Sequence, residues 1–276
     1  MNLFQEVVRL QREGRDCALC TIVNTQGSTP GKSMMKLLVR DDGSFAGSVG
    51  GGCLEAEVLE AALDAMLDER PRMLDFALNE RDYPDSGLIC GGRLQIYVEP
   101  ITEPRLYLFG GGHVSGAIAR VARPCGFHIT LLEDREAFAT AEQHPDVQDF
   151  VVGNLKDAAA DLGDLQRAFV VVCTRGHHDD GAILAGLHAG GARPRYLGMI
   201  GSRAKRAQLE QQLTAEGVDA HWLETVESPM GLPIGARNHE EIAVSVVAAL
   251  IRARRVGSAG EAEPSDLADG PDPEGP

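Results

Sequence analysis

The chain has 276 residues and a formal net charge of -15, with 43% hydrophobic and 24% charged residues. This composition is typical of a globular protein, and the length accommodates two domains with separate cores. An acidic chain disfavours nucleic acid as a partner, because it offers no basic field to replace the counterions along a phosphate backbone. No apolar stretch is long enough to cross a bilayer, and the N-terminus lacks the pattern of a secretion signal. We therefore expect no membrane partner and a cytoplasmic location.

Residues 1–103 predict a smaller α+β domain. An Asp-Gly turn between two short strands is a hairpin signal, and apolar residues at helical spacing indicate two helices. The expected elements are a helix that buries Phe4, Val7, Val8 and Leu10, a strand at 17–25, a hairpin of 36–40 and 44–48, a helix at 53–69, and strands at 73–78 and 93–99. The domain boundary is expected within residues 100–104.

Residues 104–256 alternate apolar strands with amphipathic helices, which predicts a parallel sheet in a Rossmann-like domain. The fold class is therefore α/β. The expected strands are 106–109, 129–132, 150–152, 168–173 and 196–199, and the last helix is 240–254. Residues 257–276 contain six acidic and no basic side chains, together with Pro and Gly, so we expect a disordered acidic tail.

A glycine run follows the first of these strands and precedes a helix expected at 117–123. Gly110 and Gly112 allow a tight turn and a close approach of the backbone to a pyrophosphate, whose charge then lies at the positive end of the helix. Ser115 occupies the third glycine position of such loops, and His113 lies within the run. The pattern predicts a dinucleotide-type site; the alternative is a Rossmann domain that has lost its ligand.

Three further segments follow strand ends and are expected at the same edge of the sheet, where ligands of such folds collect. Glu133 or Asp134 is placed to accept hydrogen bonds from ribose hydroxyls, which favours NAD-like ligands over 2'-phosphorylated ones. Segment 174–179 contributes Arg175 and His177. Gly201, Ser202 and Arg203 precede a helix and offer a second anion site, with Lys205 nearby. We interpret the adjacent histidines His177 and His178 as polar loop residues rather than metal ligands.

The six cysteines are spread along the chain and are expected to be thiols. Cys17 and Cys20 lie three apart in a predicted strand, so they point to opposite faces and are interpreted as core residues. Cys53 follows Gly50, Gly51 and Gly52 at the start of a helix, where the dipole favours the thiolate. Cys90 also lies beside glycines. Two accessible thiols are the functional interpretation, and small residues in tight turns are the alternative.

Seven separated motifs resemble the XdhC/CoxI family of xanthine dehydrogenase accessory factors. They are Gln26–Pro30, Gly47–Glu55, Cys90–Gly92 with Val98–Pro100, Gly110–Val114, Thr174–His177, Ile200–Arg203, and Pro229–Ala236 with Glu240–Ala243. The resemblance covers nearly all of the chain except the acidic tail. Where the family has Pro-Arg and then Gly-Ala, this chain has Pro30-Gly31 and Met34-Met35.

The resemblance implies a chaperone that binds molybdenum cofactor, as molybdopterin or its dinucleotide form. Such a protein protects the cofactor while a cysteine desulfurase supports its sulfuration, and inserts it into a xanthine dehydrogenase-type molybdenum hydroxylase. It also implies a homodimer and functional roles for Cys53 and Cys90. No catalytic turnover is required.

Two other functions remain open from the residues alone. One is an NAD-dependent oxidoreductase that uses His113 or His177 as a proton donor. The other is a sulfur carrier that forms a persulfide on Cys53 or Cys90, which overlaps with the chaperone.

Overall fold

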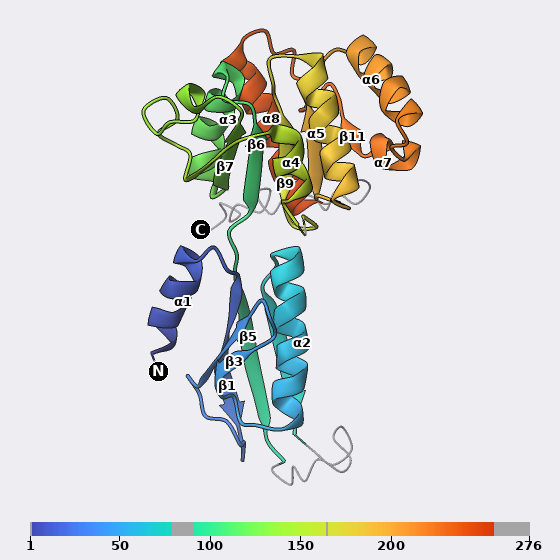
Figure 1. The fold of residues 1–276 in the computed structure, drawn as a ribbon. Coiled ribbons are helices and arrows are strands. Elements are labelled where there is room, and N and C mark those ends of the chain that lie inside the picture. The colour runs from blue at the N-terminus through green and yellow to red at the C-terminus, as the bar shows by residue number, and fades with distance from the viewer. Residues whose placement is uncertain (1, 79–90, 164, 257–276) are drawn as a thin grey trace, which may run out of the picture. The chain divides into compact units, whose positions relative to one another are not determined.

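The structure is a computed structural model that describes residues 2–78, 91–163 and 165–256 (Figure 1). The expected acidic tail, residues 257–276, lies outside the described residues. The chain forms two compact units that divide between Glu103 and Pro104. Each unit buries its own clusters of hydrophobic side chains, so each is described by itself.

The first unit is a five-stranded antiparallel sheet with a helix packed against each face (Figure 1). The strand order is β3-β2-β1-β5-β4. Its elements are α1 (Leu3–Arg12), β1 (Cys17–Gln26), β2 (Lys36–Arg40), β3 (Phe45–Gly47), α2 (Cys53–Asp68), β4 (Arg72–Ala77) and β5 (Arg93–Ile101). The predicted hairpin is confirmed, because β2 and β3 pair with Leu38 opposite Ala46.

Alternation along β1 separates the two cysteines as predicted. Cys20 packs in the cluster beneath α2, whereas Cys17 packs with Val7 and Leu10 of α1 on the other face. Burial raises the pKa of Cys17 to about 11 and that of Cys20 to about 12. Both are therefore unreactive core thiols.

The buried face of α1 is narrower than predicted. Val7 and Leu10 are buried, but Phe4 is 59% exposed and Val8 46% exposed. Residues four apart lie on the same face of a helix, so Phe4 and Val8 share one face. That face lies beside the one that contacts the sheet.

The second unit is a six-stranded parallel sheet with helices on both faces. Its elements are β6 (Arg105–Phe109), α3 (His113–Ala122), β7 (His128–Glu133), β8 (Asp149–Val152), α4 (Leu155–Ala160), β9 (Phe169–Val172), α5 (His177–Ala189), β10 (Tyr196–Met199), α6 (Arg203–Ala215), α7 (Ala220–Glu224), β11 (Val226–Glu227) and α8 (His239–Arg255), with short 3₁₀ helices at Arg123–Cys125 and Glu136–Phe138.

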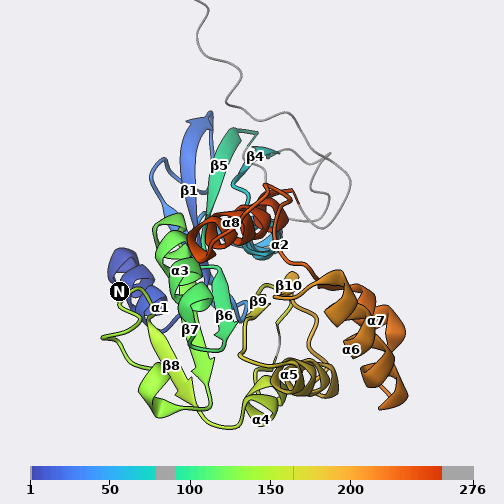
Figure 2. The same cartoon turned by 90° about the horizontal axis from the view of Figure 1, so that it is seen from above.

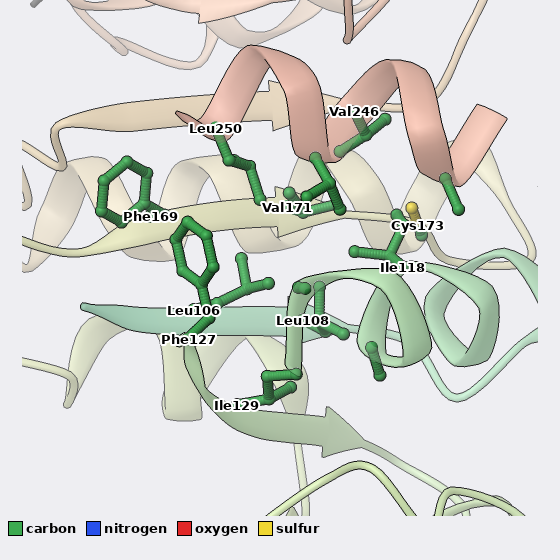
Figure 3. Close-up of a cluster of buried hydrophobic side chains, with 14 of the residues drawn as sticks. Leu106, Leu108, Ile118, Phe127, Ile129, Phe169, Val171, Cys173, Val246 and Leu250 are labelled. Carbon is green, nitrogen blue, oxygen red and sulfur yellow. The ribbon is translucent and has the colours of Figure 1, made fainter. Parts of the chain in front are cut away.

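The sheet is assembled around β6. The strand order is β11-β10-β9-β6-β7-β8. The chain adds β7 and β8 on one side of β6 and then adds β9, β10 and β11 on the other side. The boundary between β6 and β9 is therefore the switch point, where Rossmann folds bind their ligands. Helices α3 and α8 lie on one side of the sheet and α4 and α5 on the other (Figure 2). In Figure 3, Leu106 and Leu108 of β6 face Ile118 of α3 and Val246 of α8 across the core.

The predicted Rossmann-like α/β fold is confirmed, with two differences. Helix α3 begins at His113, four residues before the expected start, because Gly112 is extended and acts as its N-cap. Strand β11 was not predicted, since two residues are too few for a hydrophobic pattern. Among the described residues, no helix has the length and apolar character needed to span a membrane.

Candidate functional site

The glycine loop between β6 and α3 has a backbone that only small residues permit. Gly110 has φ +99°, and a Cβ there would meet the Cys173 carbonyl oxygen at 2.5 Å. Gly112 is the N-cap of α3, and among the described residues no side chain accepts a hydrogen bond from the N–H groups that begin the helix. These N–H groups therefore keep their capacity to bind an anion.

A cavity of about 220 Å³ lies over this loop. It is lined by the loop itself, by residues that follow β7 and β9, and by Ile200 after β10. The structure therefore brings together Gly110, Gly112, His113, Glu133, Asp134 and Arg175 among the residues selected from the sequence.

Buried Glu133 is bound to the protein itself rather than left free for a ribose. Its carboxylate accepts hydrogen bonds from Gly111 N at 2.6 Å and from Arg135 Nε at 2.8 Å, and the side chain is 3% exposed. Burial raises the pKa of Glu133, but the hydrogen bonds from Arg135 and Gly111 outweigh it, and the net pKa lies below the usual range. Through these contacts the carboxylate of Glu133 supports the glycine loop.

The Gly111 peptide is held on its other side as well. His144 Nε2 lies 3.3 Å from Gly111 O, and the histidine is buried. A Cβ at Gly111 would meet Phe138 O at 2.4 Å, so the segment after β7 covers the loop. Sequence reasoning missed His144, because its contact is 33 residues distant in the chain.

A buried polar network fixes the loops after β9 and β10. Asp180 is fully buried; it accepts a hydrogen bond from Thr174 Oγ1 at 2.5 Å and forms an ion pair with Lys205. Lys205 Nζ also donates to Ile200 O at 3.1 Å. The lysine expected near a second anion site is thus paired within the protein.

The residues of the second predicted anion site lie at the start of α6 and do not line the cavity. Ser202 Oγ accepts a hydrogen bond from Lys205 N at 3.2 Å and caps α6, while Arg203 is exposed. Gly201, Ser202 and Arg203 do not line the cavity among the described residues. His177 begins α5, and His178 is 95% exposed. The described parts of the chain hold no cluster of three or more His, Cys, Asp or Glu that would bind a metal ion.

Cys173 lines the cavity but does not supply a reactive thiolate. Burial is the main cause that raises its pKa to about 12. The neighbouring Ser115 is also fully buried, which explains why a small residue is needed at that position of α3.

In the first unit, two glycine turns flank the segment 26–30. Gly50, Gly51 and Gly52 all have positive φ at the start of α2, and Glu55 Oε1 accepts hydrogen bonds from Gly51 N at 3.1 Å and Ser48 Oγ at 2.7 Å. Among the described residues, a Cβ at Gly51 or Gly52 would meet no atom within 4 Å.

The turn lies close to other family motifs. Gly50 approaches Pro30, and Ser28 forms a bridge with Gly91. Cys53 is the first residue of α2. Cys90 lies outside the described residues.

Comparisons with known proteins match both halves of the chain. The XdhC Rossmann domain matches residues 106–250, and the XdhC and CoxI family matches residues 10–77. The uncharacterized protein YqeB of Escherichia coli is 31% identical over 255 residues, which are 92% of this chain and 46% of YqeB. A probable xanthine dehydrogenase subunit of Bacillus subtilis is 30% identical over 158 residues, 57% of this chain and 44% of that protein. This chain thus spans less than half of these two relatives.

A third relative and one solved structure match over most of their length. The molybdenum cofactor insertion chaperone PaoD of Escherichia coli is 25% identical over 286 residues, with 92% of this chain and 88% of PaoD covered. A crystal structure described as a xanthine dehydrogenase from Bacillus halodurans has a TM-score of 0.52 at 20% identity, over 94% of this chain and 97% of that one. The latter supports the fold alone.

Proposed function

Because the chain belongs to the XdhC and CoxI family, we propose that it is a maturation chaperone for molybdenum cofactor. In this proposal the protein is a cytoplasmic homodimer that binds molybdopterin or its dinucleotide form. It supports sulfuration of the cofactor by a cysteine desulfurase and inserts the cofactor into a xanthine dehydrogenase-type molybdenum hydroxylase. The observation that carries the proposal is the cavity over an uncapped helix N-terminus at the switch point of the sheet.

The residues of the second unit fit the phosphate of such a cofactor. Backbone N–H groups at Gly112 and in the first turn of α3 bind an anion, and Arg175 supplies a guanidinium beside them. A separate NAD-like nucleotide would use the same groups. Gly201, Ser202 and Arg203 remain proposed as a further contact at this edge of the sheet.

The glycine turn of the first unit fits a bulky group. Gly51 and Gly52 leave space among the described residues beside the N-terminus of α2, whose first residue is Cys53. A helix N-terminus is in general an environment that favours a thiolate. We propose Cys53 and Cys90 as the thiols that contact the cofactor. When bound, the cofactor supplies molybdenum, for which a thiolate is a suitable soft ligand.

The test is the pterin content of the purified protein. Protein from cells grown with molybdate is denatured and oxidised, and the fluorescent pterin released is measured by chromatography. We expect pterin in the wild type and at least about tenfold less in Cys53→Ala or Cys90→Ala, because one lost strong contact of about 1.4 kcal/mol lowers affinity tenfold. Cys125→Ala is the matched control, since Cys125 lies in the other unit.

Absence of pterin from the wild type would contradict the proposal. NADH oxidation by the pterin-free protein would instead support the oxidoreductase, and His113→Ala should then abolish it. Loss of pterin in Cys125→Ala to the same degree would show that the cysteine effect is not local.

A further inference from the structure

An ion pair joins two residues that line the cavity over the glycine loop. Asp134 follows β7 and Arg175 follows β9, and these strands flank β6 on its two sides. Arg175 Nη2 lies 2.8 Å from Asp134 Oδ2. The pair therefore joins two loops across the carboxyl end of β6, where the glycine loop begins.

Asp134 is the carboxylate left for a ligand once Glu133 is assigned to the loop. Both of its oxygens already face guanidinium groups, with Arg135 Nε 3.5 Å from Oδ1. Hydrogen bonding to Glu133 and burial raise the pKa of Asp134 above its usual range, although Arg175 acts in the opposite direction. A second carboxylate near Arg175 is Asp179, whose Oδ2 lies 3.7 Å from Arg175 Nε.

The exposure of the pair allows it to open. The Arg175 side chain is 52% exposed and that of Asp134 37% exposed. Ion pairs of this kind are weak in water, whereas a guanidinium binds a phosphate through two parallel hydrogen bonds. A phosphate ester at the glycine loop would thus compete with Asp134 for the same guanidinium.

We infer that Asp134 is not a ribose ligand but the counter-ion that holds Arg175 across the cavity until a phosphate-bearing ligand takes its place. The inference rests on the proposed phosphate site at the glycine loop. It assigns specificity to the phosphate ester, shared by nucleotides and pterin phosphates, rather than to the ribose hydroxyls.

The direction in which Asp134→Asn changes the binding affinity distinguishes a counter-ion of Arg175 from a ribose ligand. Full-length wild type and Asp134→Asn are titrated calorimetrically with ADP, with adenosine, and with the phosphorylated pterin released from a molybdenum hydroxylase. Freeing Arg175 should raise the affinity for a phosphorylated probe about threefold, the range of an exposed ion pair, and leave adenosine unchanged. The probe that responds identifies the nucleotide or the pterin as the source of the phosphate.

Two further variants complete the test. Asp161→Asn changes the charge by the same amount at an exposed carboxylate of the same unit that does not line the cavity, and we expect its affinity to stay within about 1.5-fold of the wild type. Arg175→Gln should lose about tenfold in affinity for the phosphorylated probe, and Asp134→Asn should have no further effect in that background. Thermal unfolding confirms that each variant is folded.

Weaker binding of ADP and adenosine alike by Asp134→Asn would overturn the inference and assign Asp134 to the ribose. An equal gain in Asp134→Asn and Asp161→Asn would also overturn it, since the effect would then be one of overall charge. If the wild type binds neither phosphorylated probe, the proposed phosphate site is itself wrong, and the inference falls with it.

Discussion

Met34 has a left-handed backbone conformation that is unfavourable for a residue with a side chain. It has φ +70° and is 67% exposed. A left-handed conformation costs a residue with a Cβ roughly 1–2 kcal/mol, whereas glycine adopts it freely. An exposed methionine in this conformation gains little packing in return.

We expect Met34→Gly to raise the free energy of unfolding by about 1 kcal/mol, measured by urea denaturation. Met73→Gly is the control, because Met73 is 53% exposed within β4 and glycine weakens a strand. The control should be destabilised. A loss of stability in Met34→Gly would show that its side chain makes contacts that matter more than the backbone.

The lowered pKa of Glu133 makes the stability of the second unit depend on pH. A carboxyl with a folded pKa below its usual value of 4.5 contributes stability above that value, and this contribution is lost as the pH falls through the folded pKa. We expect Glu133→Gln to lower the free energy of unfolding by about 1–2 kcal/mol at pH 7, since charged acceptors are stronger than neutral ones.

The same substitution should have less effect in acid. Urea midpoints of wild type and Glu133→Gln should converge as the pH drops from about 4 towards 2, because the unfolded chain then binds a proton that the folded carboxylate, with a pKa of about 2, does not yet bind. A difference that stays constant from pH 7 to pH 3 would contradict an ionised Glu133 in the folded state.

Individual residues differ in how far the sequence predicts them. Gly110 was identifiable because a buried strand that runs through glycines into a helix is the pattern of a ligand-binding loop. The loop-supporting contacts of Glu133 and His144 were not, because each depends on tertiary contacts with Gly111 across 22 and 33 residues. Their side chains carry no local pattern that distinguishes a support from a ligand contact.

At the scale of elements, the Asp180–Lys205 pair joins α5 to α6 at the edge of the sheet that carries the cavity. Removing one member of a buried ion pair leaves the other without its counter-charge. We expect Asp180→Asn to lower the free energy of unfolding by about 3 kcal/mol in urea denaturation.

Asp179→Asn provides the comparison, since its side chain is 36% exposed and one residue away. It should change stability by less than about 0.5 kcal/mol. Equal changes in the free energy of unfolding for the two substitutions would show that the buried ion pair does not stabilise the fold. Partial recovery in Asp180→Leu combined with Lys205→Met would support the pair as the cause.

Most elements were predictable because their patterns are long and periodic. The apolar runs of β6 and β9 and the amphipathic stretch of α8 identified a parallel sheet covered by helices. The exceptions lie where a pattern is short or ambiguous. Helix α3 starts earlier than predicted because the glycines before it carry no capping side chain, and β11 has two residues.

At the scale of the whole molecule, the separate hydrophobic clusters of the two units are the main feature. One set of clusters contains only residues before Glu103, and the other contains only residues after Pro104. Units with cores of their own fold independently in general. The proposed roles are divided in the same way, with thiols in the first unit and the phosphate site in the second.

We therefore expect residues 104–256 expressed alone to fold and to unfold in urea as one cooperative transition. Because the cavity, Arg175 and the uncapped α3 all lie in this unit, the fragment should bind a phosphorylated probe within about threefold of the full-length affinity. It should not retain pterin on purification, since Cys53 and the Gly50–Gly52 turn belong to the other unit. A fragment that folds but binds no phosphate would place essential contacts in the first unit, and one that retains pterin fully would exclude a role for Cys53.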